Sequence, residues 1–268
     1  MPSISIVTPV LNGERYIAET IRSVQAQTFT DWEYLIVDGG STDRTPAIVR
    51  DIAASDARIR YVCEPDQGMY DGLFKGLERS SAPLCCWINA DDQLMPWAFE
   101  AVTRYRRATG AEWVTGIGAY LDARGVMHSV AFPRWYPRKL IRLGLFHGRC
   151  LGFIQQEGTF FSRALLNKID ARTVRLIRSQ KVAGDFLFWT ALSKYAALRT
   201  LPTVLAAFRM HSSNASADQA AYYREISRAG YLVLPGLLAR LAAAVFDPIS
   251  HAVGRQIAAR WRRLINSV

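Results

Sequence analysis

Two adjacent carboxylates at the end of a strongly apolar stretch are the most chemically informative feature of this chain. Residues 84–88 have the pattern of a buried strand, and Asn89-Ala90-Asp91-Asp92 follows them directly. Two carboxylates beside a buried strand repel each other and lose hydration unless a cation lies close to them. Carboxylate, water and phosphate oxygens are the ligands that Mg²⁺ and Mn²⁺ prefer. The pair therefore predicts a divalent-metal site that would neutralise charge on a departing phosphate. An Asp-Asp turn that caps the helix beginning near Pro96 is the alternative interpretation.

The segments before this pair alternate between strand and helix patterns. Strands are predicted at residues 4–8, 33–37, 59–63 and 84–88, and helices at residues 14–25, 45–54, 68–79 and 96–107. This order predicts an α/β fold with a mostly parallel sheet flanked by helices, in which ligands bind at the carboxyl ends of the strands. Polar residues follow each of the four strands: Asn12, Asp38, Glu64 with Asp66, and Asp91 with Asp92. We therefore expect one polar, acidic edge of the sheet.

Four motifs follow one another over about the first ninety residues. They are Val7-Thr8-Pro9-Val10-Leu11-Asn12, Val37 to Asp43, Glu64 to Gly72, and Ile88 to Asp92. Their order and spacing resemble the family 2 glycosyltransferases, and most closely the branch that assembles bacterial surface polysaccharides. The resemblance continues more weakly to about residue 216. It implies a nucleotide-diphospho-sugar transferase (GT-A) sheet and an inverting, metal-dependent transfer of a sugar to a lipid-linked or glycan acceptor. A UDP-sugar is the expected donor, and guanine- or thymine-nucleotide sugars are the alternatives.

The resemblance also implies individual roles for the motif residues. Those expected to contact the nucleotide-diphosphate sugar are Thr8, Pro9, Asn12, Asp38, Gly68, Asp71 and Asp91. Within this set, Asp38 would hydrogen-bond the base, and Gly68 and Asp71 would lie near the ribose and diphosphate. Asp92 would hold Mg²⁺ or Mn²⁺ together with Asp91. The family's usual Asp-x-Asp has Asn89 at its first position here.

An inverting transfer needs a general base that accepts the proton of the acceptor hydroxyl. Ala183-Gly184-Asp185 resembles the family segment that supplies this base, so Asp185 is the expected catalytic residue; an ordinary helix N-cap is the alternative. Glu157 is the rival base because it lies in the acceptor-side region. His211 is expected to approach the metal or the diphosphate, and Arg209 to pair with phosphate oxygens. A merely exposed loop histidine is the alternative for His211.

The second half of the chain has a different pattern from the first. Strands are predicted at residues 113–120, 125–130, 158–162 and 198–208, a mobile loop at 132–148, and helices at 183–195, 218–234 and 236–265. By the resemblance, we predict a catalytic domain over residues 1–216, with a nucleotide-sugar-binding half at 1–110 and an acceptor half at 111–216. Residues 217–268 would form a basic, amphipathic helical tail.

Basic residues give the chain of 268 residues a net charge of +10, and they gather in residues 134–149 and 222–268. Such a bias attracts anionic lipid or nucleic acid. Acidic residues at the strand ends argue against nucleic acid, because they repel phosphate unless metal is bound. Large apolar residues within 231–246, followed by arginines, predict an interfacial helix on an anionic membrane. A helical pair packed on the domain, or a dimer contact, would explain the same residues.

The sequence gives three further expectations about location. Pro235 and Arg240 interrupt the longest apolar stretch, which argues against a membrane-spanning helix. No signal-peptide pattern is seen at the N-terminus, and the four cysteines form no CxxC pair. We therefore expect a cytoplasmic protein that is peripheral on the inner face of the plasma membrane.

Other classes of protein fit the sequence less well. A dinucleotide oxidoreductase needs a GxGxxG turn after the first strand, and that position holds Thr8-Pro9-Val10-Leu11-Asn12 instead. A P-loop is also absent from the sequence. A catalytically inactive nucleotide-sugar sensor or scaffold at the membrane remains the alternative to an enzyme.

Overall fold

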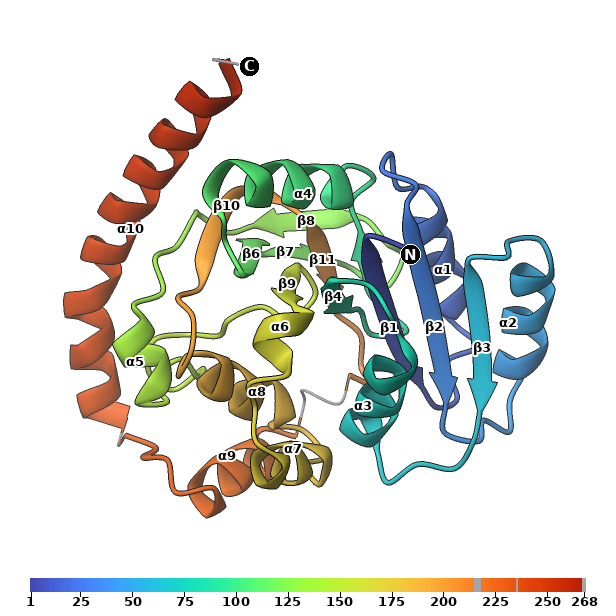
Figure 1. The fold of residues 1–268 in the computed structure, drawn as a ribbon. Helices are drawn as coiled ribbons and strands as arrows, with labels where there is room; N and C mark the ends of the chain where they lie inside the picture. Colours follow the sequence, from blue (N-terminus) through green and yellow to red (C-terminus); the bar gives the residue numbers. More distant parts are fainter. Residues whose placement is uncertain (215–217, 235, 267–268) are drawn as a thin grey trace.

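The computed structural model describes residues 1–214, 218–234 and 236–266. At its centre lies a seven-stranded sheet with the strand order β10-β6-β9-β4-β1-β2-β3 (Figure 1). The strands are β1 (Ile4–Val10), β2 (Trp32–Asp38), β3 (Ile59–Cys63), β4 (Leu84–Trp87), β6 (Trp113–Ile117), β9 (Thr159–Ser162) and β10 (Arg199–Val204). β1, β2, β3 and β4 run parallel, and β10 is parallel to β6. Only β9 runs against its neighbours β4 and β6, so the predicted, mostly parallel sheet is confirmed.

Helices cover both faces of this sheet because alternate strand residues point to opposite faces. On one face, Ile6 of β1 belongs to a buried cluster with residues of α1 (Ile17–Gln25), α2 (Thr45–Ala54) and α4 (Ala98–Thr109). On the other face, Val7 belongs to a cluster with α3 (Met69–Arg79), α6 (Arg163–Leu166), α7 (Ala171–Arg178) and α8 (Gly184–Leu192). The two apolar clusters make a three-layer arrangement that fixes the loops at the strand ends.

A smaller sheet lies at the end of β4 and has the order β5-β11-β7-β8. Its strands are β5 (Gln93–Leu94), β7 (Ala119–Leu121), β8 (Met127–Val130) and β11 (Ala206–Arg209). β5 follows Asp92 directly and pairs antiparallel with β11, so residues more than a hundred positions apart meet at the acidic pair. The single strands expected at 113–120 and 198–208 are each divided between the two sheets.

Four short elements were not expected from the sequence: β5, α6, α7, and α5 (Arg138–Arg142) within the predicted loop. Each has only two to eight residues, too few for its hydrophobic periodicity to stand out. The expected helices near 218–234 and 236–265 are present as α9 (Gln219–Arg228) and α10 (Gly236–Asn266). The boundary predicted between residues 216 and 217 lies outside the described residues.

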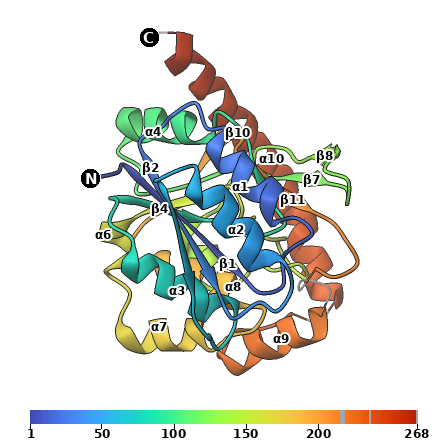
Figure 2. The ribbon, with the colours of Figure 1, turned by 90° about the vertical axis from the view of Figure 1, so that its right-hand side faces the viewer.

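The C-terminal helix α10 is the most peripheral element of the structure. It runs along one edge of the molecule, and its C-terminal end extends beyond the body in both views (Figures 1 and 2). Pro248 lies inside it without ending it. Residues Gly236–Arg263 are long and apolar enough, by length and composition alone, to cross a membrane. The stretch 231–246 singled out in the sequence is therefore only part of a longer apolar segment, because the helix continues past residue 246.

Candidate active site

The acidic pair after β4 is divided between two environments. The side chain of Asp92 is completely buried, and its carboxylate accepts hydrogen bonds from the backbone N–H of Arg209 (2.8 Å) and the Asn89 amide (3.2 Å). Burial, reinforced by Glu157 and Asp91, raises the pKa of Asp92 well above its ordinary value. The Asp91 side chain instead keeps a quarter of its surface exposed. Asp91 is thus the carboxylate of the pair that a ligand can reach.

His211 lies next to Asp91. Its Nε2 is 2.9 Å from Asp91 Oδ2, and its Nδ1 is 3.0 Å from Ser213 Oγ. The amide nitrogen of Asn214 donates to the same Asp91 oxygen at 3.3 Å. The contact of Nδ1 with Ser213 fixes the orientation of the ring, as a partner on the other ring nitrogen does for ligating imidazoles. A carboxylate and an imidazole at this distance are two donors of the types that a divalent cation accepts.

Arg209 has a structural position that differs from the sequence expectation. Its side chain is fully buried, and its guanidinium forms an ion pair with Glu19 (2.6 Å) and donates to the backbone carbonyl of Asp91 (2.7 Å). The guanidinium also lies 4.5 Å from the centre of the Tyr16 ring. The prediction that Arg209 pairs with phosphate oxygens is therefore wrong, since its donors are used inside the protein. Arg209 instead fixes the backbone that carries both carboxylates.

The four residues expected to border the nucleotide lie together at the carboxyl ends of β1 and β2. Thr8 and Pro9 are buried in β1, where Thr8 Oγ1 donates to the Ile88 carbonyl at 2.7 Å. Asn12 has a positive φ of 53° and its Oδ1 accepts from the Thr42 N–H at 2.9 Å. Asp38 is fully buried; it accepts from the Ser41 N–H (2.7 Å) and from the Tyr61 hydroxyl (2.6 Å). These contacts hold the 38–45 loop against the loop after β1.

Asp66 is a residue of this region to which the sequence gave no role. Its Oδ1 accepts from the Gly68 N–H at 2.9 Å. A Cβ placed on Gly39 would lie 2.6 Å from Asp66 Oδ2, and one placed on Gly72 would lie 2.9 Å from it. Burial raises the pKa of Asp66. Two glycines therefore leave room for a carboxylate at the rim, and their spacing in the motifs was the signal that could have identified it.

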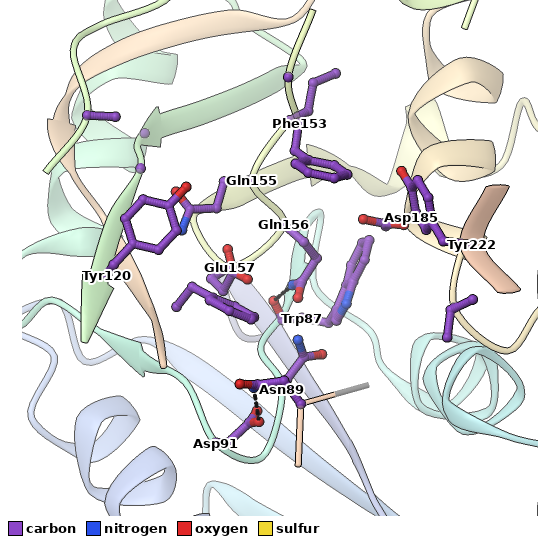
Figure 3. A pocket seen from close by; sticks show the side chains of 18 of the residues that line it. Trp87, Asn89, Asp91, Tyr120, Phe153, Gln155, Gln156, Glu157, Asp185 and Tyr222 are labelled. Carbon is purple, nitrogen blue, oxygen red and sulfur yellow. Dashed lines mark hydrogen bonds between the residues drawn. The ribbon is translucent and has the colours of Figure 1, made fainter. Parts of the chain in front are cut away.

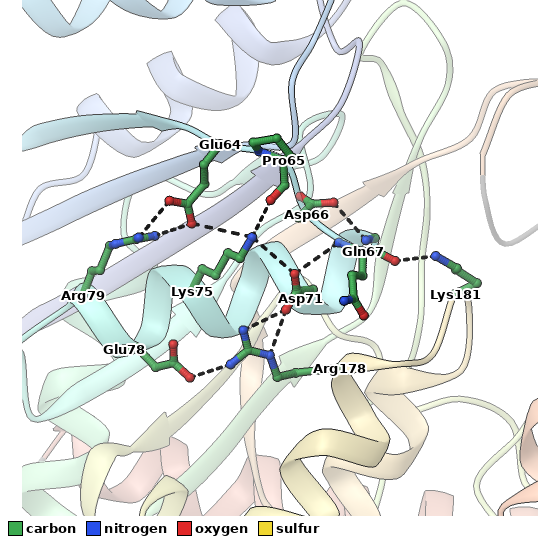
Figure 4. A network of polar contacts seen from close by, with 11 residues as sticks. Glu64, Pro65, Asp66, Gln67, Asp71, Lys75, Glu78, Arg79, Arg178 and Lys181 are labelled. Carbon is green, nitrogen blue, oxygen red and sulfur yellow. Dashed lines mark hydrogen bonds and ion pairs between the residues drawn. The ribbon is translucent and has the colours of Figure 1, made fainter.

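Gly68 and Asp71 belong to a network of charges that joins two distant parts of the chain (Figure 4). Asp71 accepts from the Arg178 guanidinium at 2.7 and 2.8 Å and lies 3.3 Å from Lys75 Nζ. Lys181 donates to the carbonyl of Gln67, the neighbour of Gly68. Arg178 at the end of α7 thus fastens the first turn of α3, and Lys181 fastens the loop before it. Neither Arg178 nor Lys181 carried a sequence signal, because their partners lie more than a hundred residues away.

A cavity of about 580 Å³ opens beside Asp91 and is lined by residues from both predicted halves (Figure 3). Its polar side chains include Asn89, Asp91, Glu157 and Asp185. Its aromatic side chains are Tyr70, Trp87, Tyr120, Phe132, Tyr136, Phe153, Phe208, Tyr222 and Tyr223. Flat aromatic faces combined with a few polar groups suit a ligand that is apolar on its C–H faces and polar at its edges.

Asp185 lies in the first turn of α8, with its side chain on the wall of this cavity. The Tyr70 hydroxyl is 3.4 Å from its Oδ1. Burial raises the pKa of Asp185 to about 6. Glu225 of α9 accepts hydrogen bonds from the backbone N–H groups of Lys181, Val182 and Ala183 at 2.9 to 3.1 Å. This carboxylate fixes the start of α8, and sequence spacing gave no sign of it.

Glu157, the rival base, lines the cavity and is almost completely buried. Among the described residues its Oε2 has no hydrogen-bond partner, nor has the neighbouring Asn89 Oδ1. Burial, with smaller effects from Asp185 and Asp91, raises the pKa of Glu157 to about 8. A buried acceptor without a donor is costly. The unpaired oxygens therefore favour a cation or a hydroxyl-bearing ligand beside them in the cavity.

Glu157→Gln should stabilise the metal-free protein at high pH. The pKa is raised from 4.5 to about 8, so between these values the folded chain keeps a proton that the unfolded chain has released, and stability falls as pH rises. We expect the variant's Tm gain over wild type to be at least about 2 °C larger at pH 8.5 than at pH 5, about 1 kcal/mol for a chain of this size. Thermal denaturation with chelator tests this, with exposed Glu100→Gln as control. An equal shift at both pH values would contradict it.

No group of three or more His, Cys, Asp or Glu side chains within residues 1–214, 218–234 and 236–266 is arranged to hold a metal ion. Asp91 and His211 nevertheless fit a divalent cation that takes its remaining ligands from a bound diphosphate and water. Mg²⁺ is commonly held by one or two carboxylates together with substrate phosphates. The donor set of this site is of that open kind.

Comparison with known proteins gives one family and a consistent set of relatives. The sequence model described as glycosyl transferase family 2 matches residues 5–169. An uncharacterized glycosyltransferase of Haemophilus influenzae is 24% identical over 80% of this chain and 68% of its own length. A GalNAc(5)-diNAcBac-PP-undecaprenol beta-1,3-glucosyltransferase of Campylobacter jejuni is 29% identical over 38% of this chain, and the matched part is 34% of that relative.

Two solved structures share the fold. TarS 1-349 of S. aureus, in complex with UDP-GlcNAc, superposes with a TM-score of 0.65 at 17% identity, over 91% of this chain and 71% of that one. The mannosyltransferase PcManGT of Pyrobaculum calidifontis, in complex with GDP-Man and Mn²⁺, gives a TM-score of 0.62 at 16% identity, over 97% and 74%. The predicted GT-A sheet with a C-terminal helix is thereby confirmed.

Proposed function

The chain belongs to glycosyl transferase family 2, and we propose that it moves a sugar from a nucleoside-diphosphate donor to a glycan or lipid-linked acceptor with inversion at the anomeric carbon. The observation that carries this proposal is a single cavity lined by both Asp91, the partner of His211, and Asp185. The pair suits the diphosphate end of a donor, and Asp185 suits the hydroxyl of an acceptor. A transferase needs both groups in one cavity, whereas a sensor needs only the first.

Asp91 and His211 would hold Mg²⁺ or Mn²⁺ in this proposal. The ion, when bound, would neutralise charge on the leaving diphosphate. The sequence gave this role first to Asp92, but both Asp92 oxygens already accept hydrogen bonds inside the protein. We therefore assign Asp92 to the positioning of the loop and Asp91 to the metal. Support for a metal comes from the unpaired Oδ1 of Asn89 and from the Mn²⁺ bound by the mannosyltransferase of similar fold.

Asp185 would remove the proton of the acceptor hydroxyl as the nucleophilic oxygen attacks the anomeric carbon. With a pKa of about 6, Asp185 is mostly ionised at neutral pH. Glu157, with a pKa of about 8, keeps its proton and cannot accept another. Their different pKa values favour Asp185 as the base, and leave Glu157 to donate a hydrogen bond in the cavity.

The nucleotide would bind along the rim formed by Thr8, Pro9, Asn12 and Asp38, with Gly68 and Asp71 towards the ribose and diphosphate. Because Asp38 and Asp71 are tied to Tyr61 and Arg178, we propose that they shape the loops that receive the nucleotide. Backbone groups of the Gly39-Gly40 turn and the Asp66 carboxylate would make the direct contacts. UDP is the proposed nucleotide, as in the TarS complex with UDP-GlcNAc.

We propose that the protein acts in surface polysaccharide assembly, at the cytoplasmic face of the plasma membrane. The Campylobacter relative is named for an undecaprenol-linked substrate. The basic helix α10 supports attachment to an anionic surface, as developed below. The same setting accounts for the acceptor, because a lipid-linked glycan reaches a cytoplasmic enzyme only at the bilayer surface.

A thermal-shift screen of UDP-, GDP- and dTDP-sugars, each with and without Mn²⁺, tests the proposed donor class. We expect the sugars of one nucleotide to raise Tm by at least about 2 °C when Mn²⁺ is present, because ligands stabilise the state that binds them. The same nucleotide sugars without Mn²⁺ should give little or no shift. A protein that shifts with a donor but never releases nucleoside diphosphate would be the sensor of the alternative interpretation. No shift with any donor would contradict the proposal.

A further inference from the structure

The segment of residues 131–136, here called the strap, lies between the cavity and α10. Ala131, Phe132, Arg134 and Tyr136 of the strap line the cavity. The Nε of Arg134 is buried without a partner among the described residues, and a Cβ placed on Gly152 would lie 2.8 Å from Arg134 Nη1. The strap is therefore one wall of the site, and the buried Nε of Arg134 is free to donate to a ligand there.

The inner face of α10 holds the other side of the strap. Ser250 Oγ accepts from the backbone N–H of Trp135 at 3.1 Å and donates to its carbonyl at 3.3 Å. Asp247 forms an ion pair with Arg134. The rings of Phe246 and Trp135 are stacked with centres 6.4 Å apart. These residues recur at helical spacing on one face, so the position of α10 decides the position of the strap.

Gly254 shows how close the two segments are. A Cβ placed on Gly254 would lie 1.9 Å from the Pro133 carbonyl oxygen, which is less than any contact between such atoms. Only glycine fits at this position of α10. At Gly254 the strap and α10 thus meet without a side chain between them, and a displacement of one requires a displacement of the other.

The outer face of α10 carries a stripe of exposed apolar side chains. Leu237, Leu241, Val245 and Ile249 are spaced four residues apart and are 72%, 56%, 69% and 50% exposed. Residues at this spacing lie on one side of a helix, and Ala239, Phe246, Ser250 and Gly254 on the opposite side are buried. The stripe is too long and continuous to be a set of scattered surface residues.

Positive charge accompanies the stripe. The basic residues of α10 are Arg240, Arg255, Arg260, Arg262 and Arg263. Its single acidic residue, Asp247, is already paired with Arg134. An apolar stripe on an arginine-rich helix matches an anionic bilayer surface. A second copy of the chain would bring the same arginines towards one another, and a spanning orientation would remove the inner face from the domain.

We infer that the outer stripe of α10 docks on an anionic bilayer, and that this docking holds the strap in place as a wall of the acceptor cavity. The inference deepens the proposed function and rests on it for the role of the cavity. The lipid would then act on the site through Asp247 and Ser250. A membrane-bound enzyme would have a completed acceptor site, and a detached one a looser site.

The docking is tested with the full chain and vesicles of phosphatidylcholine containing 30% phosphatidylglycerol (about one anionic lipid in three) or none. The wild type should co-float with the vesicles that contain phosphatidylglycerol and not with those that lack it. Leu241→Glu combined with Val245→Glu should weaken that binding at least about tenfold. Leu176→Glu combined with Met127→Glu, which also charges two exposed apolar positions, should leave it unchanged.

The coupling is tested by hydrogen exchange of peptides that cover the strap. Anionic vesicles should slow this exchange at least about fivefold in the wild type. Asp247→Asn combined with Ser250→Ala should keep flotation but lose the slowing. Exchange that does not change on bound protein would overturn the coupling, and absence of flotation would overturn the docking. Sedimentation showing a dimer that Leu241→Glu with Val245→Glu dissociates would assign the stripe to a second copy. The donor thermal shift, measured without vesicles, reports failure of the proposed function separately.

Discussion

Replacement of Asp185 by Asn should lower kcat by about 10²- to 10⁴-fold while the affinity for the nucleotide-sugar donor stays the same. Asn keeps the size of the side chain and removes only the ability to accept a proton. Its neighbour Tyr70 and the Glu225 contacts that fix α8 stay in place, so the fold should be unaffected. Transfer rates with saturating donor, together with calorimetric donor affinity, measure the two quantities.

The wild-type pH profile supplies the matching control. With a pKa of about 6 for Asp185, kcat/KM should rise about tenfold per pH unit below pH 6 and level off above it. Glu157→Gln should retain this limb, since Glu157 is protonated across that range. If Glu157→Gln abolished transfer and Asp185→Asn did not, the two roles would have to be exchanged.

Saturating Mn²⁺ should raise the donor affinity of the wild type at least about tenfold, and Asp91→Asn and His211→Ala should each abolish this gain. Each variant removes one of the two protein donors, and the site has no third donor among the described His, Cys, Asp and Glu side chains. Donor titrations at several Mn²⁺ concentrations, analysed for the coupling between metal and nucleotide, measure the effect.

Asp92→Asn is the informative control for this pair. Its carboxylate accepts from Arg209 and Asn89 inside the protein, so this change should leave the metal coupling intact. Loss of metal coupling in Asp92→Asn with normal coupling in Asp91→Asn would return the metal role to the residue that the sequence first indicated.

The strands and their polar ends could be predicted because each depends on a few neighbouring residues. A buried run such as 84–88 followed by Asp91 and Asp92 is visible in the sequence, and the parallel order places its end beside those of β1 and β2. The family resemblance added Asp185 and His211, which local patterns alone would not have selected. Asp185 lines the cavity, and His211 lies beside Asp91, which also lines it.

The partners of these residues could not be predicted, because they come from distant segments. Arg209 was expected to face phosphate, yet it pairs with Glu19, 190 residues earlier in the chain. Asp38 and Asp71 were expected to contact the ligand, but the Asp38 carboxylate accepts a hydrogen bond from Tyr61 and the Asp71 carboxylate pairs with Arg178. A motif indicates which residue types meet at a site; it does not indicate which of them face the ligand and which hold the loop.

Release of nucleoside diphosphate by the purified wild-type chain is the most direct test of the central claim. The protein would be incubated with Mn²⁺ and each of several UDP-, GDP- and dTDP-sugars, and the products separated by chromatography. We predict that one donor yields free nucleoside diphosphate, slowly with water as acceptor, and that Asp91→Asn and removal of Mn²⁺ both stop the release. Donor left intact in every reaction, or release that continues in Asp91→Asn without metal, would contradict the account.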